Sequence, residues 1–447
     1  MKNNYSSVFN SQQTIDDVIG LTQGKKIWVA YSGGIDSHVL LHLLATANCS
    51  ELESVSAIHI DHGLHADSER WAKHCTEVSA NLAIDLCHLK VDVTEIDELG
   101  MEAAARKVRY QAFQKQLTHN DVLLTAQHQH DQAETLLLQL FRGAGPKGLS
   151  AMPQQLSLGE STIIRPFLNI PQQDILAYAS QHQLRWIDDP SNAETRWNRN
   201  YIRHTIWPDI EQRWPSAAKT ISRSAEHCAD ATELMDELAA QDLDSLVIEK
   251  TNDYLPIAQL LTLSPARQKN LLRHYIECKQ FALPSTAGLQ KVIDEVCQAK
   301  QDSNPVVSWQ GVEVRRYQNQ LYFMRPLVEH DSHQILQCTS LQDTALNNGD
   351  ILTWGKVQLG GLSKQIITDG LTIRFRQGGE QIMPQGHAHH KTLKHLFQQW
   401  MVPSWQRDRT PLLYYGEELI AVVGYVLAHD YVVDQNEQGF LPTLKLN

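Results

Sequence analysis

The chain has 447 residues, of which 20% are charged and 42% hydrophobic, and its formal net charge is −12. At roughly 100–200 residues per domain, this length predicts two to four domains with their own cores, and the composition excludes a disordered chain. The acidic total disfavours nucleic acid as a partner only on average, because a partner meets a local patch and not the sum.

Cysteine spacing and apolar segments indicate the compartment. The seven cysteines include no CxxC pair, which disfavours a redox or zinc motif of that kind and a disulfide framework. The first twenty residues are polar and resemble no signal peptide, and no run of about 18 apolar residues occurs. We therefore expect a reduced, soluble, cytoplasmic protein without a membrane partner.

Residues 27–141 alternate between short apolar runs and helical segments. Continuous apolar runs suit strands buried on both faces, and helical crossovers make neighbouring strands parallel. This part predicts a doubly wound α/β parallel sheet, whose ligands bind at the carboxyl ends of the strands. The expected strands are 27–31, 55–60, 84–89 and 122–126, and the expected helices are 37–47, 68–82, 101–117 and 131–141.

The rest of the chain changes in pattern. Residues 161–223 keep some helical pattern, residues 224–300 indicate helices, and residues 350–443 mix strand-like runs with a helix at 392–400. Alternating runs at 306–309, 312–317 and 320–324 predict a hairpin. We expect three domains: an α/β domain at 1–215, a helical domain at 216–330 and a small mixed α+β domain at 345–443.

The most informative motif lies between the first strand and the first helix, and it reads Ser32-Gly33-Gly34-Ile35-Asp36-Ser37. Its glycines let backbone amides close on a phosphate, and the helix that follows presents free N–H groups to the same anion. The carboxylate of Asp36 suits a phosphate site only if Mg²⁺ bridges the two. The loop is neither a GxxxxGK[ST] nor a GxGxxG motif, and it resembles the loop of the N-type ATP pyrophosphatases, which hold pyrophosphate there and transfer AMP.

Further segments narrow the resemblance. They are HIDHGL (59–64), GMEAAARKVRY (100–110), AQHQHDQAET (126–135), FRGAGPKGL (141–149), IRPF (164–167), WIDDPSN (186–192), RNYIR (199–203), RFRQGGE (374–380) and WQRDRTPL (405–412). Together they resemble the tRNA(Ile)-lysidine synthetase family over nearly the whole chain, in its long form with a C-terminal domain. The resemblance implies that the first domain is catalytic, that the helical domain binds RNA or acts as a linker between the other two domains, and that the last domain binds tRNA.

The resemblance implies a ligase that forms a carbon–nitrogen bond. ATP adenylates oxygen 2 of the wobble cytosine in an isoleucine tRNA with a CAU anticodon and releases pyrophosphate. Free L-lysine then attacks carbon 2 and expels AMP, which gives lysidine and changes the specificity from methionine to isoleucine. The implied cofactors are ATP and Mg²⁺, the partners are this tRNA and L-lysine, and a homodimer is left open.

The same resemblance assigns residues to the site. ATP would be bound by Ser32, Gly33, Gly34, Ile35, Asp36, Ser37 and His62. Catalytic roles would fall to Asp36, Glu102, Arg106, Arg109 and Asp131, with Mg²⁺ at Asp36 and Asp131. Glu102, Arg106 and Arg109 share one helical face, which a surface salt-bridge stripe would also explain. The family pattern has two consecutive acids where this chain has His130 and Asp131, which weakens the transfer of the metal role to Asp131.

Two basic segments predict contacts with RNA. Residues 195–223 carry six Lys and Arg against two acids, with tryptophans and tyrosines between them, and residues 371–415 carry the same balance. Cations with stacking rings suit unstacked RNA bases, although aromatic core with a solvated rim would give the same pattern. The residues expected to bind RNA are Arg142, Arg196, Arg199, Asn200, Arg203, Arg374, Arg376, Lys391, Lys394 and Arg407.

Other interpretations stay open at this stage. The histidine pair His128 and His130 and the cluster His387, His389 and His390 could bind zinc, although polar cleft residues and an exposed loop are the simpler readings. A tRNA thiolase of the same superfamily would need reactive cysteines. An RNA-binding protein without turnover is the third reading. Residues 226–253 hold nine acids and one base, a balance typical of a solvated helix face.

Overall fold

The computed structural model divides into two compact units, residues 1–237 and 238–447. It describes residues 10–445 except 23, 48, 50–51, 53–54, 64, 66, 94–100, 247–253, 301–302, 359 and 434–437, and the side chains of 101 and 102. No helix in this described part is long and apolar enough to cross a membrane.

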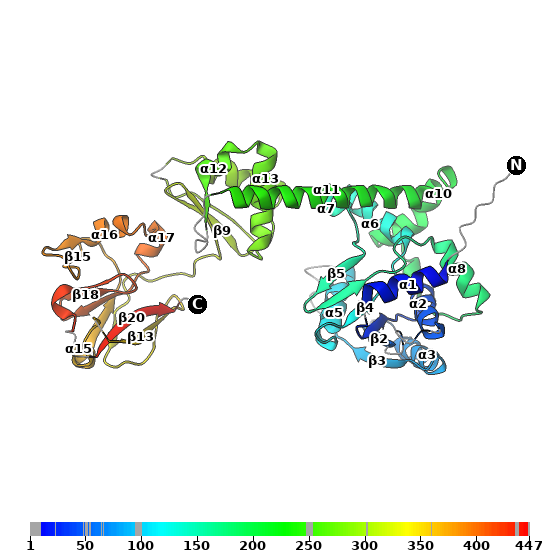
Figure 1. The fold of residues 1–447 in the computed structure, drawn as a ribbon, viewed down its shortest axis with the longest axis horizontal. Helices are drawn as coiled ribbons and strands as arrows, with labels where there is room; N and C mark the ends of the chain where they lie inside the picture. The colour runs from blue at the N-terminus through cyan, green and yellow to red at the C-terminus, as the bar shows by residue number, and fades with distance from the viewer. Residues whose placement is uncertain are drawn as a thin grey trace. The chain divides into compact units, whose positions relative to one another are not determined.

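Unit 1 is built on a sheet whose strand order, over the described residues, is β3-β2-β1-β4-β6-β5 (Figure 1). The strands are β1 (Ile27–Ala30), β2 (Val55–Asp61), β3 (Asp85–Lys90), β4 (Val122–Leu124), β5 (Gln155–Leu158) and β6 (Ser161–Ile164). All neighbours pair in parallel except β5, which is antiparallel to β6 at the edge. The sheet is therefore the expected parallel α/β sheet with one added antiparallel strand.

Helices cover both faces of this sheet. Successive residues of a strand point to opposite sides, so each face carries its own apolar side chains, and helices bury them. Ile27 and Val29 pack with α2 and α8 in one core cluster, whereas Trp28 packs with Phe113 of α5 in another. The helices of this layer structure are α1 (Ser11–Thr22), α2 (Ile35–Thr46), α3 (Ser68–Asn81), α5 (Met101–Gln116), α6 (Gln129–Phe141) and α8 (Gln172–Gln181). The doubly wound class is confirmed, and the expected strands and helices recur within a few residues.

The sequence interpretation missed the hairpin formed by β5 and β6. Residues 161–164 were assigned to a stretch with some helical pattern, but Ile163 and Ile164 are fully buried in the sheet. The β6 strand is short and pairs with β4, which lies far from it in the chain. A long-range pairing of this kind leaves only a weak periodic signal in four residues.

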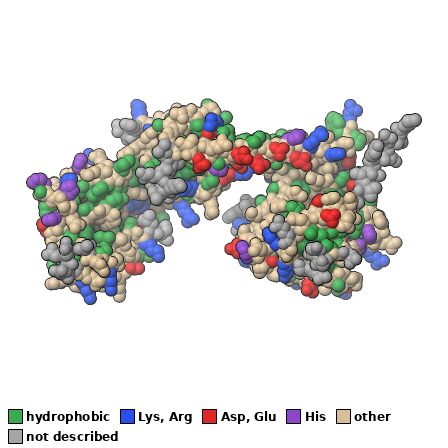
Figure 2. Space-filling model, viewed as in Figure 1, with side chains coloured by type: hydrophobic (Ala, Val, Ile, Leu, Met, Phe, Trp, Pro, Cys, Tyr) green, Lys and Arg blue, Asp and Glu red, His purple; other side chains and the backbone are tan. Residues whose placement is uncertain are grey.

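Short helices follow the sheet and lead into a long one. They are α7 (Pro146–Leu149), a 3₁₀ turn η2 (Pro190–Ala193), α9 (Asn198–Tyr201), a π-helical turn η3 (Ile202–Ile206) and α10 (Trp207–Arg213). The helix α11 (Ala217–Ser245) packs its first turns against α6 and α10 through Ala217 and Ala218. Acidic side chains lie along α11 (Figure 2), in agreement with the solvated helix expected there.

Unit 2 begins with a small antiparallel sheet covered by helices. Its strand order is β7-β10-β9-β8 among the described residues, and the expected hairpin recurs at the expected positions. The elements are β7 (Tyr254–Pro256), α12 (Ile257–Thr262), α13 (Pro265–Cys278), α14 (Thr286–Lys291), η4 (Val292–Cys297), β8 (Val306–Trp309), β9 (Val312–Tyr317) and β10 (Gln320–Met324).

The C-terminal part of unit 2 mixes small sheets and short helices around one core, which runs from Cys338 to Phe440. Its strands are β11 (Leu336–Cys338), β12 (Thr344–Ala345), β13 (Ile351–Val357), β14 (Leu371–Arg374), β15 (Gln381–Ile382), β16 (Lys391–Thr392), β17 (Leu412–Tyr415), β18 (Glu418–Val422), β19 (Val426–Leu427) and β20 (Gly439–Lys445). Its helices are α15 (Lys364–Gly370), α16 (Leu393–Gln399), α17 (Ser404–Arg407) and the turn η5 (His429–Tyr431).

Candidate active site

The loop between β1 and α2 is closed by its own serines. The Ser37 Oγ accepts a hydrogen bond from the Ser32 amide at 3.2 Å and donates to the Gly34 carbonyl at 3.0 Å. The two hydroxyl oxygens of Ser32 and Ser37 lie 3.0 Å apart. The helix that starts at Ile35 therefore opens on a compact turn, with its first amides free for an anion.

The backbone at position 33 requires a glycine. Its φ is +86°, and a Cβ built on it would lie 2.7 Å from Cδ1 of Ile187 and 3.0 Å from Sγ of Cys75. The Ile187 amide donates to the Gly33 carbonyl at 2.9 Å. The loop is thus supported from behind by a segment more than 150 residues away in the chain, and a side chain at position 33 would break this support.

A cavity of about 350 Å³ opens beside the loop. It lies at the carboxyl ends of β1 and β4, where a doubly wound sheet binds its ligands. The structure brings these expected site residues together in its wall: Ser32, Gly34, Asp36, Ser37, Arg106, Arg109, Asp131, Arg199 and Arg203. Gly33, Ile35 and His62 are not in the wall, and the side chain of Glu102 lies outside the described residues.

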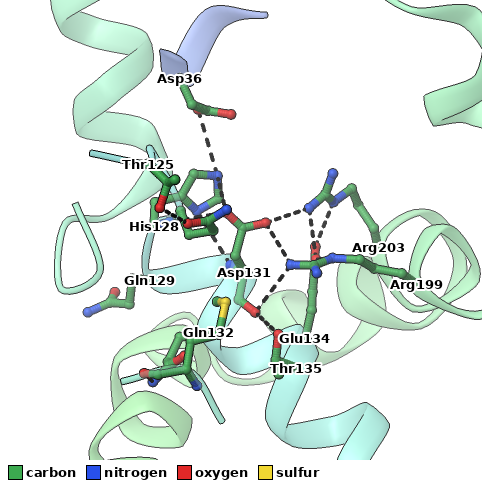
Figure 3. A network of polar contacts seen from close by, with 12 residues as sticks. Asp36, Thr125, His128, Gln129, Asp131, Gln132, Glu134, Thr135, Arg199 and Arg203 are labelled. Atoms are coloured by element: carbon green, nitrogen blue, oxygen red, sulfur yellow. Dashed lines mark hydrogen bonds and ion pairs between the residues drawn. The ribbon is translucent and has the colours of Figure 1, made fainter. Parts of the chain in front are cut away.

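Two carboxylates and two guanidinium groups form a network at one side of the cavity (Figure 3). Arg203 donates to Glu134 from Nε at 2.6 Å and from Nη2 at 2.8 Å, and to Asp131 Oδ1 at 2.8 Å. Arg199 donates to Glu134 at 2.9 Å and to Asp131 Oδ1 at 3.0 Å. The side chain of Glu134 is only 3% exposed. Both arginines are therefore held in the cavity wall by helix α6, rather than on an open surface.

His128 connects this network to the phosphate loop. Its Nδ1 accepts the Asp131 amide at 3.5 Å, and the Asp131 carboxylate accepts the His128 amide at 3.0 Å, a reciprocal cap of α6. A ring nitrogen that accepts leaves the proton on the other nitrogen. Nε2 then faces Asp36 Oδ1 at 3.7 Å and Asp131 Oδ2 at 3.5 Å, with the side chain 2% exposed (Figure 3).

The two carboxyl groups beside His128 have opposite pKa shifts. Burial raises the pKa of Asp36 above its ordinary value, and the nearby charges of His128 and Arg203 only partly oppose this. Burial also acts to raise the pKa of Asp131, but His128, Arg199 and Arg203 outweigh it and hold the pKa below the ordinary value. Neighbouring carboxyl groups whose pKa values are shifted in opposite directions are common in active sites where one group acts as an acid and the other as a base.

Asp36 fits a role as a Mg²⁺ ligand better than Asp131 does. The Asp36 Oδ1 atom is buried and has no hydrogen-bond partner among the described residues, whereas Asp131 is engaged by both arginines. Mg²⁺ usually takes one or two carboxylates and completes its shell with phosphate oxygens and water. No group of three or more His, Cys, Asp or Glu residues that could hold a metal ion occurs in the described part of the chain.

The opposite wall of the cavity is basic. Arg106 lies over the ring of Tyr110 at 5.0 Å, and both line the cavity with Arg109. Burial lowers the pKa of the nearby His62, and the charge of Arg109 lowers it further, which favours the neutral ring. The cavity therefore has one wall of paired charges and one wall of cations.

His130 is turned away from the cavity. Its Nε2 lies 3.4 Å from Glu211 Oε1, and its ring meets that of Trp207 edge-on at 5.4 Å. The side chains of His130 and Asp131 point in different directions from α6. The acid of the family pattern that His130 replaces would therefore face α10 and not the cavity. The acid that faces Asp36 is still present as Asp131.

The remaining residues expected to bind RNA have varied surroundings. Arg142 is exposed at the end of α6, and Arg196 is exposed, pairs with Glu194 and stacks on Trp197. The Asn200 amide donates to the carbonyls of Ser191 and Glu194, which is a structural role.

In unit 2, three expected RNA contacts are already engaged. Arg374 pairs with Glu417 and Arg376 pairs with Asp408, each at 3.1 Å. Arg407 donates to the Val402 carbonyl at 2.9 Å and to the Tyr317 hydroxyl at 2.8 Å. Lys394 is exposed in the first turn of α16, and Lys391 is half-buried in β16 just before it, so these two are the better placed for phosphate.

Sequence reasoning did not assign several residues that shape the cavity. Tyr31, Thr125, Gln127 and Met152 line it. His128, which the sequence places among the polar residues of the cleft, joins the two carboxylates Asp36 and Asp131. The signal available was position, because Tyr31 and Thr125 directly follow strands β1 and β4. The sequence gives no clue that Glu134, inside a helix, would hold both arginines.

Comparison with known proteins defines first the class and then the family. The model of the PP-loop domain matches residues 7–210, which contain the loop and the cavity. Two further models match behind it, the TilS substrate binding domain at 255–322 and the TilS substrate C-terminal domain at 371–443. Unit 1 is therefore a PP-loop domain, and the segments beyond it match models of one particular kind of PP-loop protein.

Whole-chain relatives agree with this. A tRNA(Ile)-lysidine synthase of Coxiella burnetii is 41% identical over 97% of this chain and 96% of its own length. Another, from Pectobacterium atrosepticum, is 39% identical over 92% of both chains. A crystal structure of a TilS C-terminal domain matches 25% of this chain and 97% of its own, at 15% identity and a TM-score of 0.21. The chain belongs to the tRNA(Ile)-lysidine synthase family.

Proposed function

We propose that this protein converts the wobble cytidine of a CAU-anticodon isoleucine tRNA into lysidine, with ATP and L-lysine as co-substrates. Family membership over nearly the whole chain supports the reaction class. The observation that carries the proposal is the cavity in which the phosphate loop, an orphaned carboxylate oxygen and a wall of arginines meet. Such a site suits cleavage between the α- and β-phosphates of ATP.

The phosphate loop would hold the leaving pyrophosphate. The first amides of α2 would bind it, because an anion is favoured at the start of a helix, and the hydroxyls of Ser32 and Ser37 keep the loop closed around this point. Arg106 and Arg109 would meet the phosphates from the opposite wall, where charge develops as AMP is transferred. Arg199 and Arg203 line the same cavity on the side of Asp131 and Glu134, so we assign them to the cavity and not to the RNA surface.

Asp36 would hold Mg²⁺, and the ion when bound would supply positive charge that stabilises the phosphates of ATP. Its buried Oδ1, which has no hydrogen-bond partner among the described residues, supports this assignment. Asp131 is better described as a positioning group, because both arginines and His128 already occupy its oxygens.

The second step needs a neutral lysine amine, so a group must accept the ammonium proton. Asp36, His128 and Asp131 are coupled through distances of 3.7 and 3.5 Å. We assign the proton-accepting role to this cluster of side chains, within which Asp131 positions His128. The cysteine nearest the loop does not offer an alternative, because burial raises the pKa of Cys75 to about 12; this disfavours the thiolase reading.

The tRNA would be bound by cations outside the cavity. Arg142 and Arg196 in unit 1 and Lys391 and Lys394 in unit 2 are the candidates. Phosphate contacts of this kind give affinity without sequence information.

The proposal is tested with purified full-length protein, ATP, labelled lysine and a CAU-anticodon tRNA. We expect one AMP and one pyrophosphate for each lysine incorporated, and no AMP release when tRNA is omitted. The Asp36→Ala variant should lose AMP formation and keep its affinity for tRNA. Incorporation of no lysine by the wild type would refute the proposal, and AMP formation that survives in Asp36→Ala would refute the role of Asp36.

A further inference from the structure

Helix α6 carries an exposed aromatic ring at the end remote from the cavity. Phe141, its last residue, is 68% exposed. A phenylalanine so open to water is unusual, because burial of a large apolar ring is favourable. The ring has no role in the core or in the cavity wall described above.

Phe141 lies on the same face of α6 as the carboxylates of the cavity. Asp131, Glu134, Leu138 and Phe141 are spaced by three, four and three residues, which places them in one stripe along a helix. At about 1.5 Å per residue the ring is about 15 Å from Asp131 along the axis. This is too far for the base that reacts, but within reach of a neighbouring nucleotide of the same loop.

The end of α6 fixes the backbone that carries the ring. The amides of Gly143 and Ala144 donate to the carbonyls of Leu140 and Gln139, both at 3.0 Å, and Gly143 has a φ of +70°. This is a helix stop closed by a left-handed glycine. Because the backbone is fixed, only the side chain of Phe141 has to be ordered when a planar partner packs on its ring.

The surroundings of Phe141 favour RNA. Arg142 and Lys147 are both exposed, and no Asp or Glu occurs in the sequence from residue 135 to residue 159. A ring beside cations in an acid-free segment suits a base with its phosphate. A second copy of the chain is a poorer fit, because one phenylalanine buries about 200 Å² whereas a stable dimer needs about 800 Å² per partner.

We propose that Phe141 is a stacking platform for the anticodon base next to the reacting cytosine. This rests on the proposed function, because that base is the adenine of the CAU anticodon. The platform would hold the loop open while the wobble base enters the cavity, and the stripe on α6 would set the spacing between the two bases. Phe141 is thereby a binding residue for the RNA and has no role in ATP chemistry.

The test uses full-length protein and an anticodon stem-loop with 2-aminopurine in place of that adenine, because stacking quenches its fluorescence. Wild type should quench it on binding. Phe141→Leu, which keeps an apolar side chain but removes the ring, should lose the quenching and bind on the order of tenfold more weakly. Phe141→Trp should retain both, and the KM for ATP should not change in either variant.

Leu140→Ala is the matched control. Leu140 is 50% exposed and adjacent in the chain, but it lies about 100° round the helix from Phe141. It should bind and quench as the wild type does. Wild-type quenching in Phe141→Leu would overturn the proposal, and so would an equal loss in Leu140→Ala. A change from dimer to monomer in Phe141→Leu with quenching intact would instead assign the ring to a second copy.

The platform and the proposed function can fail separately. If the wild type makes no lysidine but Phe141 still governs quenching, the reaction is wrong and the platform stands. If lysidine forms and quenching is independent of Phe141, the platform is wrong and the reaction stands.

Discussion

Arg203 binds both carboxylate oxygens of Glu134, from Nε at 2.6 Å and from Nη2 at 2.8 Å. The arginine belongs to a basic segment that the sequence assigns to RNA, yet the contact holds it in the wall of the cavity. The geometry is bidentate, which fixes the guanidinium plane as well as its charge. Glu134 thereby determines where the cations of this wall lie.

Glu134→Gln should destabilise the protein strongly. It leaves both guanidinium groups with Asp131 as their one remaining ion-pair partner among the described residues, and breaking a buried ion pair costs about 3 kcal/mol or more. Urea unfolding followed by fluorescence measures the loss. Glu211→Gln is the control, because Glu211 is 50% exposed and contacts only His130 among the described residues. It should change stability by less than about 0.5 kcal/mol, and an equal effect of both variants would contradict the buried network.

Asp36→Asn and Asp131→Asn should change stability in opposite directions. The folded-state pKa of Asp36 is raised, so its ionised form is disfavoured by the fold at neutral pH. Asp36→Asn should then raise the melting temperature at pH 7, and the gain should shrink as the pH falls through the raised pKa. This cost of ionisation is consistent with a residue kept for function.

Ionisation of Asp131 has the opposite effect on stability, because the folded-state pKa of Asp131 is lowered. Its ionised form stabilises the fold at neutral pH, and the benefit is lost as the pH falls below the ordinary value of about 3.9. Asp131→Asn should therefore lower the melting temperature at pH 7 and approach the wild type in acid. Melting curves without ATP, from pH 3 to pH 8, test both variants, and shifts of the same sign would refute the description of the pair.

Gly33→Ala should impair the use of ATP while leaving most of the fold intact. The new Cβ would meet Ile187 at 2.7 Å in a backbone conformation that side chains avoid. We expect kcat/KM for ATP to fall at least tenfold, on the order of 1.4 kcal/mol in transition-state binding. Gly20→Ala, where a Cβ meets nothing within 4 Å, should behave as the wild type. Normal turnover in Gly33→Ala would contradict the support of the loop by Ile187.

Lys391 and Lys394 should contribute to tRNA affinity through phosphates. Replacing both with alanine should weaken binding at low salt and reduce the slope of log affinity against log salt by about 2. Lys364→Ala is the control, because Lys364 is exposed on α15 of the same unit but outside the acid-free segment 381–407. An unchanged salt slope in the double variant would remove this surface from the proposal.

Local features of the site were predictable and long-range ones were not. The phosphate loop at Ser32–Ser37 and the buried strands follow from residue order and periodicity, because they depend on neighbours in the chain. The position of Arg203 does not, since counting charges along residues 195–223 ignores that α6 brings Glu134 and Asp131 to meet it. His128 was equally hidden, because its role depends on which ring nitrogen caps its own helix.

The surroundings of His130 were also not predictable from the sequence. The sequence shows that an acid of the family pattern is missing, but not which way that side chain points. In the structure it contacts Glu211 and Trp207, away from the cavity. The departure from the pattern therefore leaves Asp36, His128 and Asp131 in place.

The most direct test of the central claim is mass spectrometry of the wobble nucleoside after incubation of the full-length protein with CAU-anticodon tRNA, ATP and L-lysine. We predict that the cytidine gains the mass of lysine less one water, only when all three substrates are present. An unmodified cytidine in the complete reaction, with protein that still binds both ATP and the tRNA, would contradict the account.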